Sequence, residues 1–323
     1  MIDPQQMMQQ LSLEQLVITA DRYFTSLADP TPWIVKPLSS WVEAPELLQN
    51  IGVLLSEMYL GKTMAVLDFR AGSCWLSKML TQLGCQTISC NVSDKALEIG
   101  KQVYAKLPVL GRSFPPKFLP FHGRNIDLPN NAVDRMVCND AFHHVPNTGE
   151  ILREFARILK PGGIAEFSEP GRFHSRSLQS QQEMRNYVVL ENDVDLNAIF
   201  RLVKSAGFDL LSCKWMANMD ATLEEHHALM GVDETQGPAS LEKEVARSPI
   251  ANTKHIIKNK TIFYLYKGPT HLDSGCHVGL AHDISVEQSD YTIQCGQTLS
   301  IEFDVRNTGS AEWLAENVFA LAS

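Results

Sequence analysis

Apolar positions recur at helical spacing through the first sixty residues and then change to short runs. From residue 13 to 24, and again from 47 to 58, apolar side chains return every three or four positions, with the Pro-rich stretch DPTPW between them. This pattern predicts amphipathic helices. From Met64 onward, short apolar runs alternate with helical stretches, which is typical of parallel strands covered by helices on both faces. We therefore expect a helical N-terminal cap over residues 1–62, followed by an α/β domain over 63–267.

The α/β part of the chain holds seven predicted strands. They are expected at 65–68, 86–91, 118–121, 135–138, 164–169, 210–215 and 261–266. Helices are expected at 74–83, 93–107, 147–159 and 195–206, and Lys160-Pro-Gly-Gly163 is expected to end the third of these. Two further helical patterns, at 223–230 and 241–246, are expected to cover one edge of the sheet. The fold class is thus α/β, with a Rossmann-like seven-stranded sheet.

The composition changes after Lys267. A polar stretch over 268–282 predicts a linker, and residues 283–323 then alternate in polarity at Leu299, Ile301, Phe303 and Val305 before the turn signal Asn307-Thr-Gly. A free-standing β-sandwich needs roughly 100 residues. We expect these residues to form a partial β-sandwich-like segment.

Composition and charge restrict the class of protein. The chain has 323 residues, of which 44% are hydrophobic and 20% charged, so a disordered protein is excluded. Its net charge of -9 lacks the excess of cations that nucleic acid binding requires. No apolar run is long enough for membrane insertion and the N-terminus has no secretion signal, which predicts a cytoplasmic protein. The seven cysteines are scattered without a CxxC pair, which favours reduced thiols.

The loops that follow the predicted strands are the expected place for chemistry. In a sheet of this kind, ligands bind beyond the carboxyl ends of the strands. The loop after the first strand reads Asp68-Phe-Arg-Ala-Gly-Ser-Cys-Trp75. Asn91 ends the second strand, at the position where nucleotide-binding folds usually carry an acid for the ribose. These residues predict a nucleotide-like ligand at this edge.

Three segments resemble one family. VLDFRAGSCWLS, LPNNAVDRMVCNDAFHHV and LREFARILKPGG, in this order, resemble class I S-adenosylmethionine-dependent methyltransferases over about residues 64–267. The resemblance implies a sheet whose last strand is antiparallel, and S-adenosyl-L-methionine as the cofactor. It also implies a set of cofactor-binding residues: Asp68, Arg70, Gly72, Asn91, His122, Gly123 and Asp140.

The same segments depart from the family pattern at the positions that hold the cofactor. The family's loop reads Asp-x-Gly-x-Gly-x-Gly, whereas this chain has Arg70 and Cys74 at the outer glycine positions. Asn91 replaces the family's ribose-binding acid, and His122 replaces an Asp after the third strand. An amide lacks the charge-assisted hydrogen bond that a carboxylate makes with a hydroxyl. We expect these changes to weaken cofactor binding.

Four residues after the fourth and fifth strands are candidates for the acceptor side. His143 and His144 follow the fourth strand, and Glu169 and His174 follow the fifth. A histidine there is a candidate general base for an acceptor hydroxyl. Glu191, Asp193 and Asp195 precede a predicted helix and are interpreted as cap residues, and His226-His227 lacks the spacing of a helical metal pair, so no metal site is expected.

The favoured function is an enzyme that methylates a small molecule or a saccharide, at a hydroxyl. The alternative is a non-catalytic, methyltransferase-like binding or scaffold module, for which the altered cofactor residues argue. A dinucleotide-dependent oxidoreductase is disfavoured because Gly-x-Gly-x-x-Gly is absent. The segment SIEFDVRNTGSAEWL resembles immunoglobulin-like sandwiches appended to proteins that handle surface glycans, which points to carbohydrate. The acceptor atom and the oligomeric state are left open.

Overall fold

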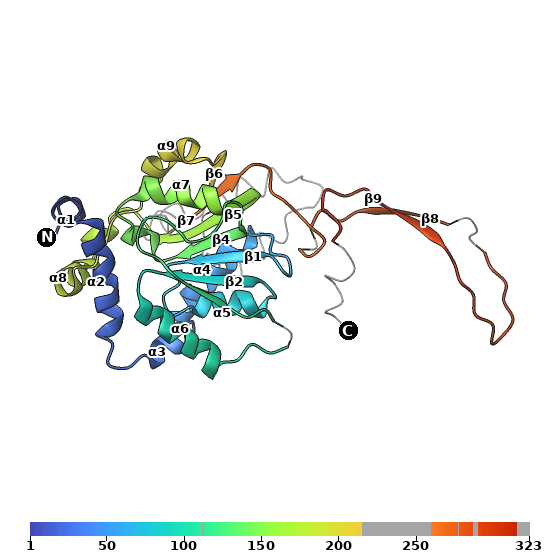
Figure 1. Cartoon of the computed structure of the whole chain (residues 1–323), viewed down its shortest axis with the longest axis horizontal. Helices are drawn as coiled ribbons and strands as arrows, with labels where there is room; N and C mark the ends of the chain where they lie inside the picture. The colour runs from blue at the N-terminus through green and yellow to red at the C-terminus, as the bar shows by residue number, and fades with distance from the viewer. Residues whose placement is uncertain (112, 215–259, 277, 287–289, 315–323) are drawn as a thin grey trace, which may run out of the picture.

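The centre of the molecule is a seven-stranded mixed sheet (Figure 1). The computed structural model describes residues 1–111, 113–214, 260–276, 278–286 and 290–314. The strands lie in the order β3-β2-β1-β4-β5-β7-β6. All neighbours are parallel except β7, which is antiparallel to both β5 and β6. The strands are β1 (Ala65–Phe69), β2 (Gln86–Asn91), β3 (Lys117–Pro120), β4 (Val133–Asn139), β5 (Leu159–Pro170), β6 (Leu210–Lys214) and β7 (Lys260–Lys267).

Helices cover both faces of this sheet. The helices that follow strands are α5 (Trp75–Gln82), α6 (Asp94–Lys106), α7 (Thr148–Ile158) and α9 (Leu196–Ala206). Apolar residues of α7 and α9 pack with Leu67 and Phe69 on one face, and residues of α5 pack with Val66 on the other. Successive residues of a strand point to opposite faces, so a strand that is buried on both faces, such as β1, needs helices on both sides. The predicted α/β class and the seven-stranded sheet are confirmed.

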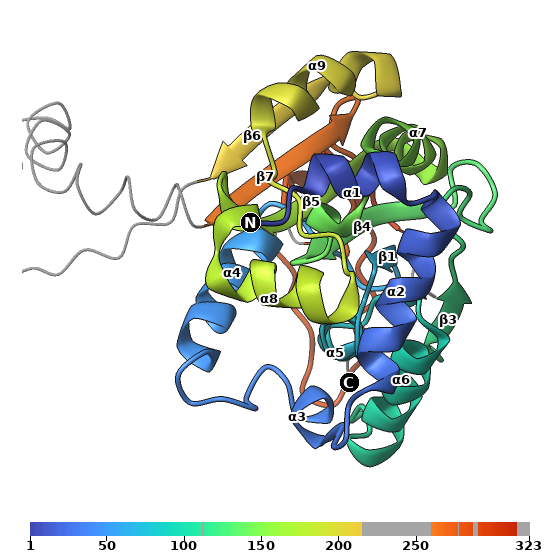
Figure 2. The same cartoon turned by 90° about the vertical axis from the view of Figure 1, so that its left-hand side faces the viewer.

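The N-terminal helices do not form one cap. They are α1 (Pro4–Gln10), α2 (Leu13–Thr25), α3 (Thr31–Ile34) and α4 (Ala44–Ser56). Ile51, Leu54 and Met58 belong to the same apolar cluster as Val66 and Tyr264, so α4 covers a face of the sheet. Helices α1 and α2 lie at the carboxyl ends of the strands, beside α8 (Leu178–Tyr187) (Figure 2). Helix α3 also reaches this end, because the Ser73 hydroxyl in the loop after β1 donates to the Trp33 oxygen. The expected cap over 1–62 is therefore divided between the core and the rim of the site.

The segment Lys160-Pro-Gly-Gly163 differs from its prediction. Helix α7 ends at Ile158, and these four residues already belong to β5. The pairing of β4 with β5 shifts between Val133 and Arg135, which accommodates the extra residues. Gly162 has φ +78°, a conformation that suits glycine. The helix stop and the strand start therefore coincide.

Residues after β7 are tied to the α/β domain by a buried arginine. Arg135 is 1% exposed and donates hydrogen bonds to the backbone oxygens of Met58, Asp134 and His271. The His271 N–H in turn donates to the Gly162 oxygen at 3.0 Å. The first part of the predicted linker thus lies against the domain, while the boundaries at 268 and 282 remain predictions.

The C-terminal strands β8 (His282–Val286) and β9 (Phe303–Asn307) form a separate antiparallel pair that projects from the domain (Figure 1). Both strands are exposed along their whole length. The helices expected at 223–230 and 241–246 lie outside the described residues. Within the described part of the chain, no helix has the length and apolar character that crossing a membrane requires.

Replacing Arg135 with Met is expected to destabilise the protein by about 2–4 kcal/mol, because three backbone carbonyl groups, that of Met58 buried, lose their donor. Urea unfolding measures the loss, and limited proteolysis should cut faster within 268–276. The control is Arg153→Met, at an exposed position of α7, which should change stability by less than about 0.5 kcal/mol. Equal stability of the two variants would contradict the role given to Arg135.

Candidate functional site

The carboxyl ends of β1, β2, β4 and β5 meet at one end of the sheet and carry nearly all of the predicted site residues. Asp68 is in β1, Asn91 ends β2, and Glu169 is near the end of β5. A short 3-10 helix, η1 (Phe142–His144), follows β4, and a second, η2 (His174–Arg176), follows β5. The order of the strands reverses beside β1, as expected for a ligand site in this type of sheet.

The loop after β1 keeps the backbone of a glycine-rich turn although it holds one glycine. Arg70, Gly72 and Cys74 have φ values of +55°, +53° and +59°. Left-handed backbone costs about 1 kcal/mol or more for residues other than glycine. An added Cβ at Gly72 would meet no atom within 4 Å. The loop therefore leaves open space above Gly72.

A glycine elsewhere in the fold compensates for Cys74. Gly100 lies in α6, and a Cβ built there would collide with the Cys74 Sγ. Cys74 is 0% exposed, and burial raises the pKa of its thiol to about 12. Cys74 is thus a neutral packing residue between the loop and α6.

Asp68 turns inward, away from the open space of the loop. Its Oδ2 accepts a hydrogen bond of 2.6 Å from the Ser77 hydroxyl, and Ser77 accepts one of 2.7 Å from Ser89. Burial raises the pKa of Asp68 to about 7, although the Ser77 hydrogen bond lowers it. In this structure Asp68 ties β1 to α5.

At the end of β2, Asn91 and an unexpected residue lie next to each other. Asn91 is 4% exposed, and its Oδ1 accepts from the Ser93 N–H at 2.9 Å. Asp21 of α2 accepts from the Ser93 hydroxyl at 2.7 Å. Asp21 therefore brings a carboxylate to the N-terminus of α6, close to the position where the family's acid is missing. Its distance in sequence from Asn91 explains why sequence reasoning missed it.

His122 and Gly123, in the loop after β3, differ in burial. The side chain of His122 is exposed. Gly123, with φ +92°, is packed so closely under α2 that an added Cβ would lie 2.8 Å from Val17 Cγ2. Gly123 thus holds α2 against this loop. A contact of either residue with a cofactor remains a prediction.

Glu169 fixes the conformation of η1. Its Oε1 accepts from the N–H groups of Ala141 and Phe142 at 3.0 and 2.9 Å. Its Oε2 lies 3.2 Å from the His143 N–H and 2.8 Å from His143 Nδ1. Burial raises the pKa of Glu169 to about 7, against the backbone donors that lower it. The geometry gives Glu169 a positioning role for His143.

His143 and His144 are neutral imidazoles. Burial lowers the pKa of His143 to about 3 and that of His144 well below its ordinary value. His144 Nδ1 lies 2.6 Å from the Leu190 oxygen and donates its proton to it, which leaves Nε2 as the acceptor nitrogen.

His174 and Glu191 join this cluster. His174 Nε2 lies 2.7 Å from Glu191 Oε2, and burial raises the pKa of Glu191 to about 7. Of the three acids interpreted as helix caps, only Asp195 caps α9, through the Asn197 N–H at 3.0 Å. Asp193 accepts from the Ser175 N–H at 2.8 Å. Glu191 instead turns into the interior, a position that its sequence neighbourhood did not indicate.

Two cations stand near the cluster. Lys260 Nζ lies 3.3 Å from Asp140 Oδ1, so the Asp140 of the predicted cofactor set forms an ion pair with β7. Burial lowers the pKa of the Arg70 guanidinium, while nearby acidic groups that include Glu169 and Glu191 raise it. The charge of Arg70 therefore acts electrostatically on the histidine-glutamate cluster.

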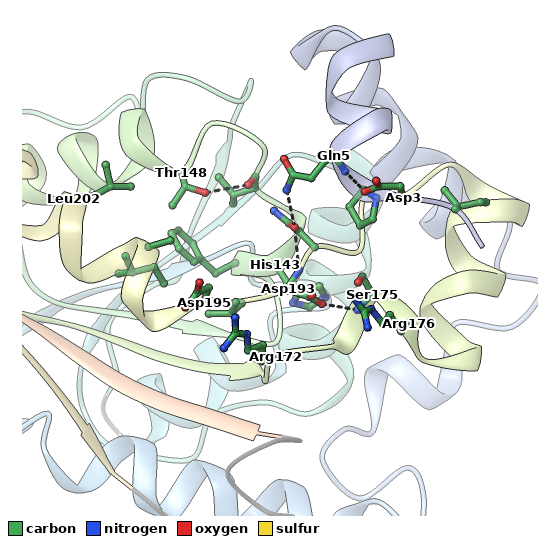
Figure 3. Close-up of a pocket in the computed structure, with 18 of the residues that line it drawn as sticks. Asp3, Gln5, His143, Thr148, Arg172, Ser175, Arg176, Asp193, Asp195 and Leu202 are labelled. Atoms are coloured by element: carbon green, nitrogen blue, oxygen red, sulfur yellow. Dashed lines mark hydrogen bonds between the residues drawn. The ribbon is translucent and has the colours of Figure 1, made fainter.

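A cavity of about 680 Å³ adjoins the cluster (Figure 3). His143 forms part of its wall, together with residues from the N-terminus, η2 and the start of α9. Its charged lining residues are Asp3, Arg172, Arg176, Asp193 and Asp195. The cavity can therefore take a polar molecule and bring it to His143.

Comparisons with known proteins find a methyltransferase domain within the chain. Residues 67–167 match the model of the methyltransferase domain family. The chain is 26% identical over 123 residues to a demethylmenaquinone methyltransferase of Streptomyces griseus. The aligned region covers 37% of this chain and 50% of that protein. It is 27% identical over 111 residues to a ubiquinone/menaquinone biosynthesis C-methyltransferase of Citrobacter koseri, covering 32% and 43%. The chain spans about half the length of these relatives.

Solved structures share the fold at low identity. A geranyl diphosphate methyltransferase, solved with GPP and sinefungin, aligns with a TM-score of 0.54 at 12% identity over 78% of this chain and 99% of its own. The phosphoethanolamine N-methyltransferase 2 of Haemonchus contortus, solved with S-adenosyl-L-methionine, aligns with a TM-score of 0.52 at 16% identity over 80% and 60%. At these identities the likeness concerns the fold alone.

Replacing Gly100 with Ala should destabilise the protein by about 1–3 kcal/mol, because the new methyl group collides with Cys74. The double variant Gly100→Ala/Cys74→Gly should recover most of this loss in urea unfolding. Gly52→Ala is the control, since that α4 glycine has no atom within 4 Å of an added Cβ and should become up to about 1 kcal/mol more stable. No recovery in the double variant would refute the compensation.

Replacing Asp68 with Asn should change how stability depends on pH. Because the pKa of Asp68 is raised to about 7 in the folded state, that state binds the proton more tightly than the unfolded chain, and its stability falls as pH rises from 4 to 7. The melting temperature of the variant minus that of the unaltered protein should therefore increase from pH 5 to pH 8. The largest change in the free energy of unfolding that this one group can cause over the pH range is about 4 kcal/mol. A difference that stays constant with pH for Asp68→Asn would disprove the raised pKa.

Proposed function

We propose that this chain, whose residues 67–167 form a class I S-adenosylmethionine-dependent methyltransferase domain, transfers a methyl group from S-adenosylmethionine to a hydroxyl of a small polar molecule or a saccharide. One observation carries the proposal. The loop after β1 keeps left-handed backbone at Arg70, Gly72 and Cys74, and the space above Gly72 is open. Strained backbone that persists without glycine is typical of a functional turn.

The residues around this loop fit a polar cofactor. At the carboxyl ends of β4 and β5, Asn139 Oδ1 and Ser168 Oγ are buried without a hydrogen-bond partner among the described residues. Buried polar atoms of this kind are usually satisfied by a ligand or by water. Gly72 would leave room for the methionine part of the cofactor, and Asn91 and Asp21 would face its ribose. The bound cofactor supplies a methyl group that its sulfonium already activates.

Arg70 makes the cofactor site unusual. Its guanidinium interacts electrostatically with Glu169 and Glu191, so its charge acts on the acceptor side. A negatively polarised acceptor group would be attracted to it.

The cavity beside His143 supports a polar acceptor. Three carboxylates and two guanidinium groups line it, so a molecule with several hydrogen-bonding groups is favoured over an apolar one. The quinone pathway names of the relatives suggest carbon as an alternative methyl acceptor. The charged lining favours a hydroxyl.

The histidines provide a base for such an acceptor. As the bond from the methyl carbon to sulfur breaks and the bond to the acceptor oxygen forms, the hydroxyl proton must leave. His144 Nε2 carries a free lone pair because Nδ1 donates to the Leu190 oxygen. His143 is held in one orientation by Glu169. We assign the proton to His144 Nε2, while Glu169 holds the neighbouring His143 in the wall of the cavity.

Substituting Gly72 with Ala should weaken S-adenosylmethionine binding by at least about ten-fold in calorimetric titration, because the methyl group enters the open space above the loop. Gly111→Ala is the matched control: Gly111 also has positive φ, +79°, and also no atom within 4 Å of an added Cβ. It should carry a similar backbone strain and bind with less than two-fold change.

Two outcomes would argue against the proposal. If the unaltered chain does not bind S-adenosylmethionine, the non-catalytic binding module becomes the better reading. If it binds but transfers labelled methyl groups only to carbon in a mixture of phenolic quinone precursors and saccharides, the hydroxyl acceptor is wrong.

A further inference from the structure

Three side chains beside the proposed acceptor site point their ligand atoms at one spot. These are His143 in the middle of η1, His174 at the start of η2, and Glu191 in the segment before α9. One nitrogen or oxygen from each lies within 4.8 Å of the other two. His174 Nε2 is 2.7 Å and His143 Nε2 is 3.6 Å from the same oxygen, Glu191 Oε2. Around Zn²⁺ with bonds of about 2.0–2.2 Å, tetrahedral ligands lie roughly 3.3 Å apart, so small shifts would suffice.

The hydrogen bond to Glu169 determines which nitrogen of His143 faces this spot. His143 Nδ1 is 2.8 Å from Glu169 Oε2, and a carboxylate accepts a proton there. Nε2 therefore carries a bare lone pair and faces Glu191 Oε2, which is also an acceptor. Two acceptors that face each other inside a protein repel unless a proton or a cation lies between them. A carboxylate on the far nitrogen is also the usual support of a metal-binding histidine.

A second observation concerns the other oxygen of Glu191. Glu191 is 2% exposed, and its Oε1 has no hydrogen-bond partner among the described residues. His144 Nδ1 lies 3.3 Å from it, but that nitrogen donates its proton to the Leu190 oxygen at 2.6 Å. A buried carboxylate oxygen without a donor is expensive. This oxygen would gain a partner from a bound cation.

The charges near the cluster leave room for a cation. Glu169 and Glu191 bring two buried carboxylates, and the Arg70 guanidinium interacts with them electrostatically. Lys260 is paired with Asp140. Two acidic groups thus share one nearby arginine, and a further positive charge would be stabilised.

We propose that His143, His174 and Glu191 bind a divalent transition-metal cation such as Zn²⁺, with Glu169 orienting His143. Two histidines and one carboxylate leave positions of the metal open for water or substrate. The cavity of about 680 Å³, in whose wall His143 lies, supplies the entry path. This inference replaces the expectation that Glu191 is a helix cap without a metal role. It does not depend on methyl transfer.

The test is metal binding by the full chain after treatment with a chelator. Calorimetry with Zn²⁺ should give one site per chain. Co²⁺ should give visible absorption bands without the near-ultraviolet thiolate charge-transfer band, since the expected ligands are nitrogen and oxygen. Glu191→Gln should weaken binding at least about 100-fold, and Glu169→Gln about 10- to 100-fold.

The matched control is His271→Ala. His271 forms the exposed pair with Glu312 at 3.7 Å, so it is a histidine-carboxylate pair outside the cluster, and its loss should change the affinity less than two-fold. Circular dichroism checks that each variant is folded. Should the unaltered chain bind no Zn²⁺ stoichiometrically, should Glu191→Gln bind as tightly, or should the thiolate band appear, the proposal is wrong. Binding of S-adenosylmethionine, measured separately, tells this failure from a failure of the proposed function.

Discussion

The site depends on one buried carboxylate. Glu169 sits at the end of β5 with no exposure and accepts three backbone N–H groups of residues 141–143 together with His143 Nδ1. These bonds fold the chain after β4 into η1 and fix the ring of His143. A carboxylate with several donors is strongly held, and removing it would leave those donors unpaired inside the protein. The positions of both histidines therefore follow from a residue on the neighbouring strand.

The loop after β1 shows a second constraint, that of close packing. The fold requires left-handed backbone at three alternate positions, and here two of them carry side chains. Cys74 is tolerated because Gly100 of α6 has no side chain. Burial opposes the charge of Arg70, and the nearby acidic groups Glu169 and Glu191 stabilise it electrostatically. The strain of each residue is offset by a partner from another element, so the turn keeps its shape while its chemistry changes.

Local signals made most of the fold predictable. The strand expected at 86–91 coincides with β2, and the helix expected at 195–206 is α9, with Asp195 as its N-cap and Gly207 after its end. Periodicity and caps act over a few residues, so one sequence carries them. The candidate histidines were also predictable, because they follow strand ends. Asp21 and Glu191 were not, because their roles arise from contacts between distant segments, and helix-cap rules account for an acid before a helix without any reference to its partners.

Unpartnered polar atoms distinguish the site from the core. Glu166, in the middle of β5, has both carboxyl oxygens buried without partners, and burial raises its pKa well above the ordinary value. Protonation lowers the free-energy cost of burying that carboxyl group, and no ligand is needed for this. Asn139 and Ser168 are paired in register on β4 and β5. Protonation cannot lower the cost of burying their unpartnered oxygens, because both side chains are already neutral. Their unsatisfied oxygens can gain only from a bound molecule or water. Since both lie at the strand ends beside the loop of Gly72, the cost of leaving them unpaired favours occupation of this end of the sheet.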